Sequence, residues 1–187
     1  MAIFVLGLII FFVPHLATAF ARGARGKVVK ALGAGPYKGT YSLVSAIGLG
    51  LIIWGWGRAD ATVLFVAPAL ALHVVYLLTL LALIALASAY LPKGRIAAAL
   101  KHPMLAGVKL WALAHLIVNG DVRSLILFGS FLAYGVLDRI AVKLRNAPTP
   151  TAGPVVNDLY AVGVGAAVWA AIYFVLHPYI AGVPIPR

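Results

Sequence analysis

The stretch VAPALALHVVYLLTLLALIALASAYL, residues 66–91, contains 26 residues and no Lys, Arg, Asp or Glu. A helix needs about 17 to 25 predominantly apolar residues to cross the hydrocarbon core of a bilayer. A run of this length without a charge is therefore typical of a transmembrane helix, and it is long enough to tilt. The fold of the whole chain follows from the repetition of such runs.

Five further apolar runs have similar composition, and the fifth of the six is the shortest. The six runs cover residues 2–20, 41–56, 66–91, 103–118, 124–137 and 159–177. Hydrophobic residues make up 64% of the chain and charged residues only 10%, against about 25% charged in soluble domains. The sequence predicts an all-α integral membrane protein, a bundle of about six transmembrane helices, in which residues 1–187 form a single membrane domain within the lipid bilayer.

The net charge of +11 is distributed unevenly among the connections between these runs. Eleven basic residues lie in the first, third and fifth connections: Arg22, Arg25, Lys27, Lys30, Lys38, Lys93, Arg95, Lys101, Arg139, Lys143 and Arg145. By the positive-inside rule these connections face the cytoplasm and both termini face outward. The charge therefore indicates topology and contact with anionic lipids, and no nucleic acid is expected as a partner.

Histidine is the residue type that carries candidate chemistry. The chain has no cysteine, which excludes disulfides, thiolate metal sites and a cysteine nucleophile. The four carboxylates, Asp60, Asp121, Asp138 and Asp158, lie near the ends of the apolar runs, which disfavours a carboxylate-based iron or zinc site. All five histidines lie in or at the ends of the runs: His15, His73, His102, His115 and His177. Neutral imidazole is a common ligand of metals and of haem.

Two of these histidines end apolar stripes that could accommodate a flat ring. In KHPMLAGVKLWALAHLIVNGD, residues 101–121, the face of His115 also carries Met104, Gly107, Val108, Trp111 and Ala112. In the first run, Leu8, Phe11 and Phe12 precede His15 on its face. We expect Gly107 and Ala112 to leave room for a porphyrin. The alternative interpretation is that both stripes serve only helix packing.

The chain resembles the NnrU membrane-protein family, whose plant relatives include the 15-cis-zeta-carotene isomerases. The resemblance rests on His102-Pro103, on Ala114-His115-Leu116, on Tyr37-Lys38-Gly39 and on His177-Pro178. It implies a multispan protein of the bacterial inner (plasma) membrane, linked to nitrite and nitric oxide metabolism in denitrification or to a haem-dependent cis–trans isomerase-like reaction. The isomerases carry a further histidine after the second span, where this chain reads WGWGRAD, residues 54–60.

The isomerase members hold a b-type haem through two histidines that are similar to His15 and His115, so the resemblance implies these two as iron ligands. His73 matches His115 better in membrane depth and is the substitute for His15. We expect Arg22 and Arg25, or Lys109, to meet the haem propionates, although Lys109 could instead pair with Asp138. His102 is expected to solvate the start of a helix at Pro103.

Two other classes of function remain open at this stage. Membrane methyltransferases of the isoprenylcysteine type also carry a histidine-proline pair before an apolar helix, but preceded by arginine and followed by paired glutamates. This chain has Lys101 at that place and no glutamate. A cofactor-free scaffold or assembly factor needs no chemistry from the histidines. A hydrophobic substrate, a redox partner or a second copy of the chain are the partners left open beside lipid.

The topology can be tested with reporter fusions. Because the basic residues of the odd-numbered connections retain those loops in the cytoplasm, fusions at Lys30, Lys93 and Arg145 should show cytoplasmic reporter activity. A periplasm-active reporter placed after Arg187 should be active. Cytoplasmic activity of that last fusion would contradict the span count.

Overall fold

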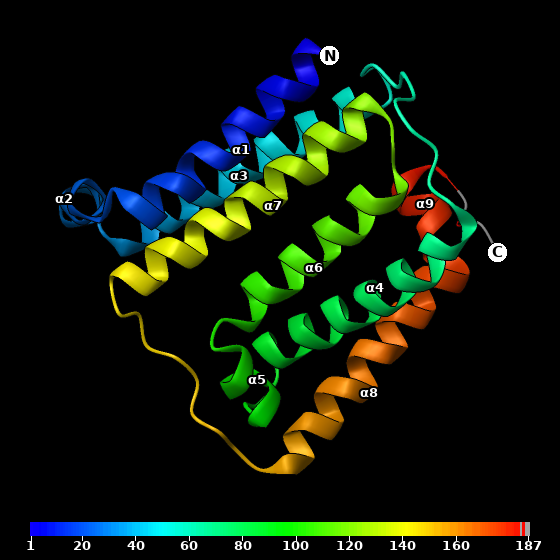
Figure 1. Ribbon diagram of the computed structural model, residues 1–187. Helices are drawn as coiled ribbons and strands as arrows, with labels where there is room; N and C mark the ends of the chain where they lie inside the picture. The colour runs from blue at the N-terminus through cyan, green and yellow to red at the C-terminus, as the bar shows by residue number, and fades with distance from the viewer. Residues whose placement is uncertain (184, 186–187) are drawn as a thin grey trace. The chain divides into compact units, whose positions relative to one another are not determined.

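The computed structural model describes residues 1–183 and 185, and within them the chain is a series of helices (Figure 1). Five segments of this part are long and apolar enough to span a membrane: α1 (Ala2–Phe20), α3 (Ala34–Trp56), α4 (Ala69–Tyr90), α7 (Val122–Leu144) and the run Val155–Ala181. That run consists of α8 (Val155–Ala171), the π-helical turn η1 (Ile172–Leu176) and α9 (His177–Ala181). A shorter apolar helix, α6, covers Pro103–Val118. The prediction of an all-α membrane protein is confirmed.

The bounds of the first and fourth spans match the prediction, whereas the second, fifth and sixth are longer than predicted. The expectation of a short fifth span is wrong, because α7 continues for 23 residues to Leu144. Its added last turns carry Asp138, Arg139 and Lys143, polar residues that end a hydropathy run without ending a helix. The shorter apolar helix is α6, with 16 residues.

The first connection is helical as well. Helix α2 covers Arg22–Leu32, and Gly33, with φ of 87°, separates it from α3. A left-handed φ of this kind favours glycine. Pro36 lies in the first turn of α3, where its missing N–H breaks no intrahelical bond.

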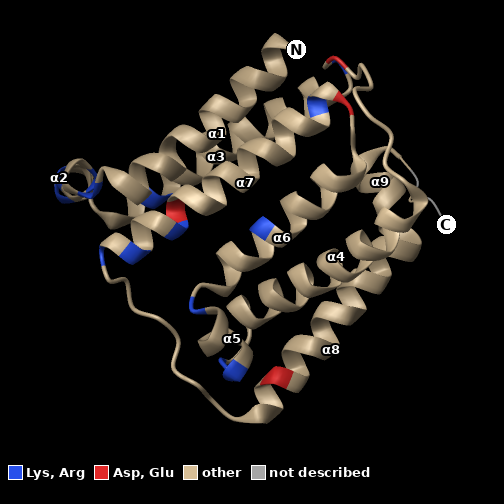
Figure 2. Ribbon diagram, in the orientation of Figure 1, with Lys and Arg blue, Asp and Glu red and all other residues tan. Residues whose placement is uncertain are grey.

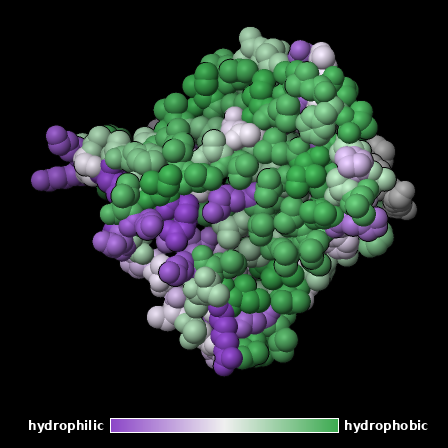
Figure 3. Space-filling view, viewed as in Figure 1, coloured by the Kyte–Doolittle hydropathy of each residue, from purple (hydrophilic) through white to green (hydrophobic). Residues whose placement is uncertain are grey.

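The chain folds into two compact units. The first contains Met1–Val66 and Asn119–Ala147, and the second contains Ala67–Val118 and the described part of Pro148–Arg187. Apolar side chains remain exposed along the long helices of both, as at Ile53 and Leu70, and hydrophobic residues cover most of the face seen in Figure 3. Such surfaces fit a lipid environment. That residues 1–187 act as one membrane domain stays a prediction.

In the first unit, α1 packs against α3 and α7. Phe4, Leu8 and Phe12 repeat at every fourth position on one face of α1, and they are buried together with Ile52 of α3. Phe12 also meets the ring of Phe131 of α7, with centroids 5.0 Å apart. This apolar face determines which side of α1 points into the unit.

Glycines bring the backbones of α1 and α3 together. A Cβ atom added to Gly48 would lie 2.6 Å from the amide nitrogen of Phe11, and one added to Gly55 would lie 2.6 Å from that of Phe4. On the other helix, a Cβ at Gly7 would lie 2.6 Å from the amide nitrogen of Ile52. Small residues at such positions let helices in lipid gain van der Waals contact over a large area.

At the opposite end of this unit from α2, a turn before α7 joins the loop after α3. Asp121 caps α7 by accepting hydrogen bonds from the amide and hydroxyl of Ser124, at 3.0 and 2.6 Å. The amide of Leu64 donates to the carbonyl of Gly120 at 2.7 Å and so joins the two loops. Nearby, hydrogen bonds from the Thr62 hydroxyl and amide lower the pKa of the Asp60 carboxyl.

In the second unit, α4 packs against α6 and α8 through small residues. A Cβ added to Gly165 of α8 would lie 2.6 Å from the Cα atom of Ile84, whereas nothing lies within 4 Å of Gly163. Among the described residues of this unit, six alanines are almost completely buried: Ala82, Ala85, Ala97, Ala112, Ala114 and Ala161. The core of this unit is therefore built from short side chains and closely spaced backbones.

A carboxylate fastens the start of α8 to the short helix α5 (Arg95–Leu100). Both oxygens of Asp158 accept backbone hydrogen bonds, from Arg95 at 3.0 Å and from Ile96 at 2.9 Å. The side-chain amide of Asn157 donates to the carbonyl of Lys93 at 3.0 Å. The Lys93 ammonium in turn donates to carbonyls at the end of α4, including those of Ser88 and Ala89. These bonds satisfy helix ends that lack intrahelical partners.

The contact between α1 and α3 predicts opposite outcomes for two neighbouring glycines. Gly48→Ala should lower the free energy of unfolding by about 1–3 kcal/mol, because the new methyl group meets backbone that cannot move aside. Gly50→Ala has nothing within 4 Å of the added atom and should be neutral or stabilising by up to about 1 kcal/mol. Thermal unfolding of the purified protein in detergent compares the two. Equal destabilisation by both would contradict the packing.

Candidate functional site

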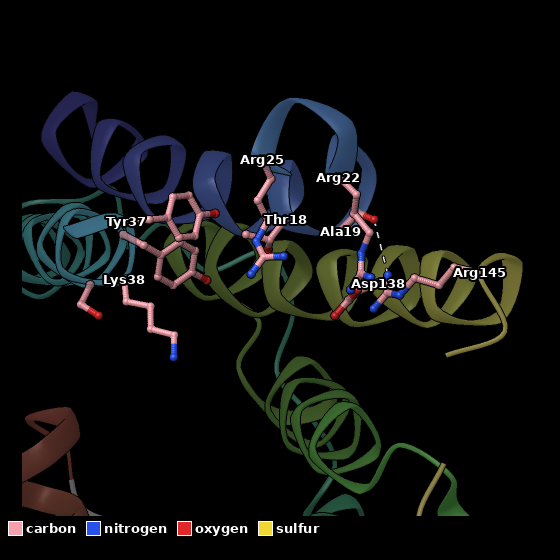
Figure 4. A pocket seen from close by; sticks show the side chains of 10 residues that line it. Thr18, Ala19, Arg22, Arg25, Tyr37, Lys38, Asp138 and Arg145 are labelled. Atoms are coloured by element: carbon pink, nitrogen blue, oxygen red, sulfur yellow. Dashed lines mark hydrogen bonds and ion pairs between the residues drawn. The ribbon is translucent and has the colours of Figure 1, made fainter. Parts of the chain in front are cut away.

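The first unit contains a polar pocket of about 400 Å³ at the end of its helices that adjoins α2 (Figure 4). The end of α1, the first half of α2, the start of α3 and the end of α7 supply its walls. Its lining residues are Thr18, Ala19, Arg22, Arg25, Tyr37, Lys38, Tyr41, Ser42, Asp138 and Arg145. Four of them are cations and one is a carboxylate, so the pocket is suited to an anionic group.

Asp138 organises the wall that α7 contributes. Its carboxylate forms an ion pair with Arg145, with 3.8 Å between the oxygen and nitrogen, and accepts a hydrogen bond from the hydroxyl of Tyr134 at 3.4 Å. Arg145 also donates to the carbonyl of Ala19, the end of α1, at 3.4 Å. The Nε atom of Arg145 is buried without a hydrogen-bond partner among the described residues. Arg145 therefore has an N–H donor that the Asp138 carboxylate of the same pocket does not use.

His15 lies one helical turn before this pocket. Its Nδ1–H donates to the carbonyl of Phe11 at 2.6 Å, and its ring stacks on that of Phe11 with centroids 4.3 Å apart. The rings of Tyr41 and Tyr134 approach it at 5.2 and 5.7 Å. In a neutral imidazole whose Nδ1 carries the proton, Nε2 has the lone pair. The contacts thus orient the ring and leave Nε2 as the nitrogen able to bind a metal.

His115, in the second unit, has the same local arrangement. Its Nδ1–H donates to the carbonyl of Trp111 at 2.8 Å, again four residues earlier in the helix. The rings of Trp111 and His115 lie 5.2 Å apart. Gly107 was expected to leave room for a ring on this face, but Leu86 and the carbonyl of Ala82 already occupy the place of its missing side chain. Gly107 therefore serves the contact between α6 and α4.

The remaining histidines have other surroundings. His73 is exposed in the first turns of α4, with its ring 6.5 Å from that of Tyr76. His102 directly precedes α6, and its backbone carbonyl accepts from the amide of Ala106 at 3.0 Å. The expected role of its side chain at this helix start stays a prediction. His177 begins α9, and its Nδ1–H donates to the carbonyl of Val183.

The site includes residues that the sequence did not indicate. These are Tyr41 in the pocket wall, Tyr134, which donates to Asp138, and the pairing of Asp138 with Arg145; the expected partner of Asp138 was Lys109. Tyr134 and Asp138 are four residues apart and therefore share a face of α7. The predicted span ended at residue 137, which placed Asp138 outside the helix and hid this relation. No sequence signal could have brought Tyr41 and Arg22 to the same cavity.

The donor set in the first unit fits a haem group. An oriented imidazole supplies a lone pair, and cations one to two turns away could meet the two propionates; Arg22 and Arg25 are among them. Across residues 1–183 and 185, no three His, Cys, Asp or Glu side chains form a group that could hold a metal ion by themselves. A haem group would need only one or two imidazoles from the protein, because its porphyrin would supply the other nitrogen ligands of the iron.

These features define a multi-pass helical membrane protein with oriented imidazoles and a cationic pocket. A family model described as NnrU protein matches residues 3–185, so the chain belongs to the NnrU family. No curated protein and no solved structure matches the chain. The relation to the zeta-carotene isomerases stays a prediction.

Removing the carboxylate of the pocket should destabilise the first unit. Asp138→Asn leaves the guanidinium of Arg145 without its counterion beside three other cations, and we expect a loss of about 1–3 kcal/mol in the free energy of unfolding. The matched control is Asp60→Asn, which changes a fully exposed carboxylate and should stay within about 0.5 kcal/mol. Thermal unfolding in detergent measures both. An unaltered Asp138→Asn variant would show that the ion pair contributes nothing.

Proposed function

We propose that this NnrU-type membrane protein binds haem b, with the imidazoles of His15 and His115 as iron ligands. The observation that supports this most is the arrangement both share, in which Nδ1–H donates to the carbonyl four residues earlier, at 2.6 and 2.8 Å. Histidines that ligate metals typically donate their other ring N–H to a carbonyl or carboxylate, which fixes the tautomer and the ring orientation.

The surroundings of His15 add to this proposal. Phe11, Tyr41 and Tyr134 confine the imidazole to one orientation, so little conformational entropy is lost when Nε2 binds a ligand. Arg22 and Arg25 line the adjoining pocket, where their positive charges could neutralise the haem propionates. The proposed haem site therefore combines an oriented nitrogen donor with cations in the same unit.

A haem held by the imidazoles of His15 and His115 would supply one-electron redox chemistry and the capacity to bind small gases such as nitric oxide. With the family resemblance, this supports a role in nitrite and nitric oxide metabolism, or in a haem-dependent cis–trans isomerisation, in the bacterial inner membrane. In either role the part of the protein is to hold the imidazoles, to neutralise the propionates and to exclude water.

The test is an absorption spectrum of the protein purified from cells supplied with haem, first oxidised and then reduced. We expect a haem b spectrum that His15→Gly and His115→Gly each abolish or convert to high spin. Added imidazole should restore the original bands in both variants, because it replaces the deleted ligand without repairing lost packing. His102→Gly should leave the bands nearly intact.

The outcomes separate the alternatives. A colourless protein, or bands that survive both substitutions, would overturn the proposal. If His73→Gly changes the same bands as His115→Gly while His15→Gly does not, the second iron ligand is His73 and not His15. Arg22→Gln combined with Arg25→Gln should accelerate haem loss with unchanged band positions, as expected for propionate partners.

A further inference from the structure

Helix α2 differs from every long helix in the first unit in its composition and exposure. Its sequence, RGARGKVVKAL, contains four cations and no carboxylate. None of its 11 residues is buried. Two of the cations, Arg22 and Arg25, line the pocket, and the Arg25 guanidinium lies 5.4 Å from the centroid of the Tyr37 ring. The other two, Lys27 and Lys30, lie outside it.

The axis of α2 crosses those of its neighbours. Figure 1 shows α2 end-on, whereas α1 and α3 run across the picture. Since α1 and α3 are long enough to span the bilayer, a helix that crosses them where they end runs along the membrane surface. Figure 2 shows basic residues on α2 and at the neighbouring end of α7. This end of the first unit is therefore strongly positive.

The exposed side chains of α2 divide into two faces. At 3.6 residues per turn, Val28 and Leu32 share one face, and Lys30 lies roughly opposite Val28. Val28 is 43% exposed and Leu32 is 55% exposed. Exposed valine and leucine beside lysines, on a short surface helix, are the pattern of a helix that lies in a membrane interface.

We propose that α2 is an interfacial helix that binds the headgroups of anionic phospholipids. Val28 and Leu32 enter the boundary between headgroups and acyl chains, and Lys27 and Lys30 contact the phosphates. The partner follows from charge complementarity, because α2 has four cations and no acidic residue to neutralise them. Zwitterionic lipid would accept the apolar face but would leave the lysines without a net attraction. This inference is independent of haem binding.

The absence of cysteine from the chain makes a direct test possible. A single Val28→Cys variant, labelled with an environment-sensitive fluorophore, is reconstituted in vesicles of phosphatidylcholine alone or of phosphatidylcholine and phosphatidylglycerol in equal parts. Lipids that carry a nitroxide on the acyl chain quench the label when residue 28 lies in the interface. We expect stronger quenching in the vesicles that contain phosphatidylglycerol, and a return toward the value in phosphatidylcholine at high sodium chloride.

Substitutions in the same labelled protein test whether Lys27 and Lys30 contribute to docking on anionic lipid. Lys27→Gln with Lys30→Gln should reduce the equilibrium constant for docking about fivefold per lysine in the anionic vesicles. Lys27→Arg with Lys30→Arg should keep the quenching. Arg139→Gln with Lys143→Gln removes the same charge from α7 and is the matched control, expected to have little effect.

Equal quenching in the two kinds of vesicle would overturn the proposal, as would an equal loss of quenching in the α7 control. The first result would indicate a helix that docks by its apolar face alone, and the second a response to net charge without a contribution specific to α2.

Discussion

The close approach of helix backbones is the constraint on which this structure depends. Between helices in lipid, hydrocarbon competes equally for apolar side chains, so association relies on van der Waals contact over well-matched surfaces. In the first unit Gly48 and Gly55 let α3 touch the backbone of α1, and in the second Gly165 lets α8 touch that of α4. The apolar face of α1 that carries Phe4 and Phe12 is thereby held in register.

The orientation of the two main candidate ligands depends on the helices themselves. A histidine that donates Nδ1–H to the carbonyl four residues earlier uses a partner that its own helix always provides. Tertiary packing then decides how tightly the ring is confined. His15 is surrounded by aromatic rings from α1, α3 and α7, and the ring of His115 contacts that of Trp111.

Charge in the first unit is arranged around one end of its bundle. The pocket collects cations from α2, α3 and α7 around Asp138, and the outer face of α2 presents the remaining lysines. These two surfaces differ in chemistry, because the pocket is lined by polar and charged side chains whereas α2 is amphipathic. A cofactor carboxylate suits the first and a lipid headgroup suits the second.

The sequence by itself determined that the chain is an all-helical membrane protein and where most spans lie, because the thickness of hydrocarbon sets the length of an uncharged run. It also determined the candidate histidines and the basic connections. Only the tertiary structure decided that Gly48 is a contact and Gly50 is open, and that Leu86 fills the space beside Gly107. It alone brought Arg22, Tyr41 and Asp138 into one pocket. Periodicity gives the faces of a helix, but the rotation and depth of each helix against its neighbours depend on shape complementarity between side chains distant in sequence.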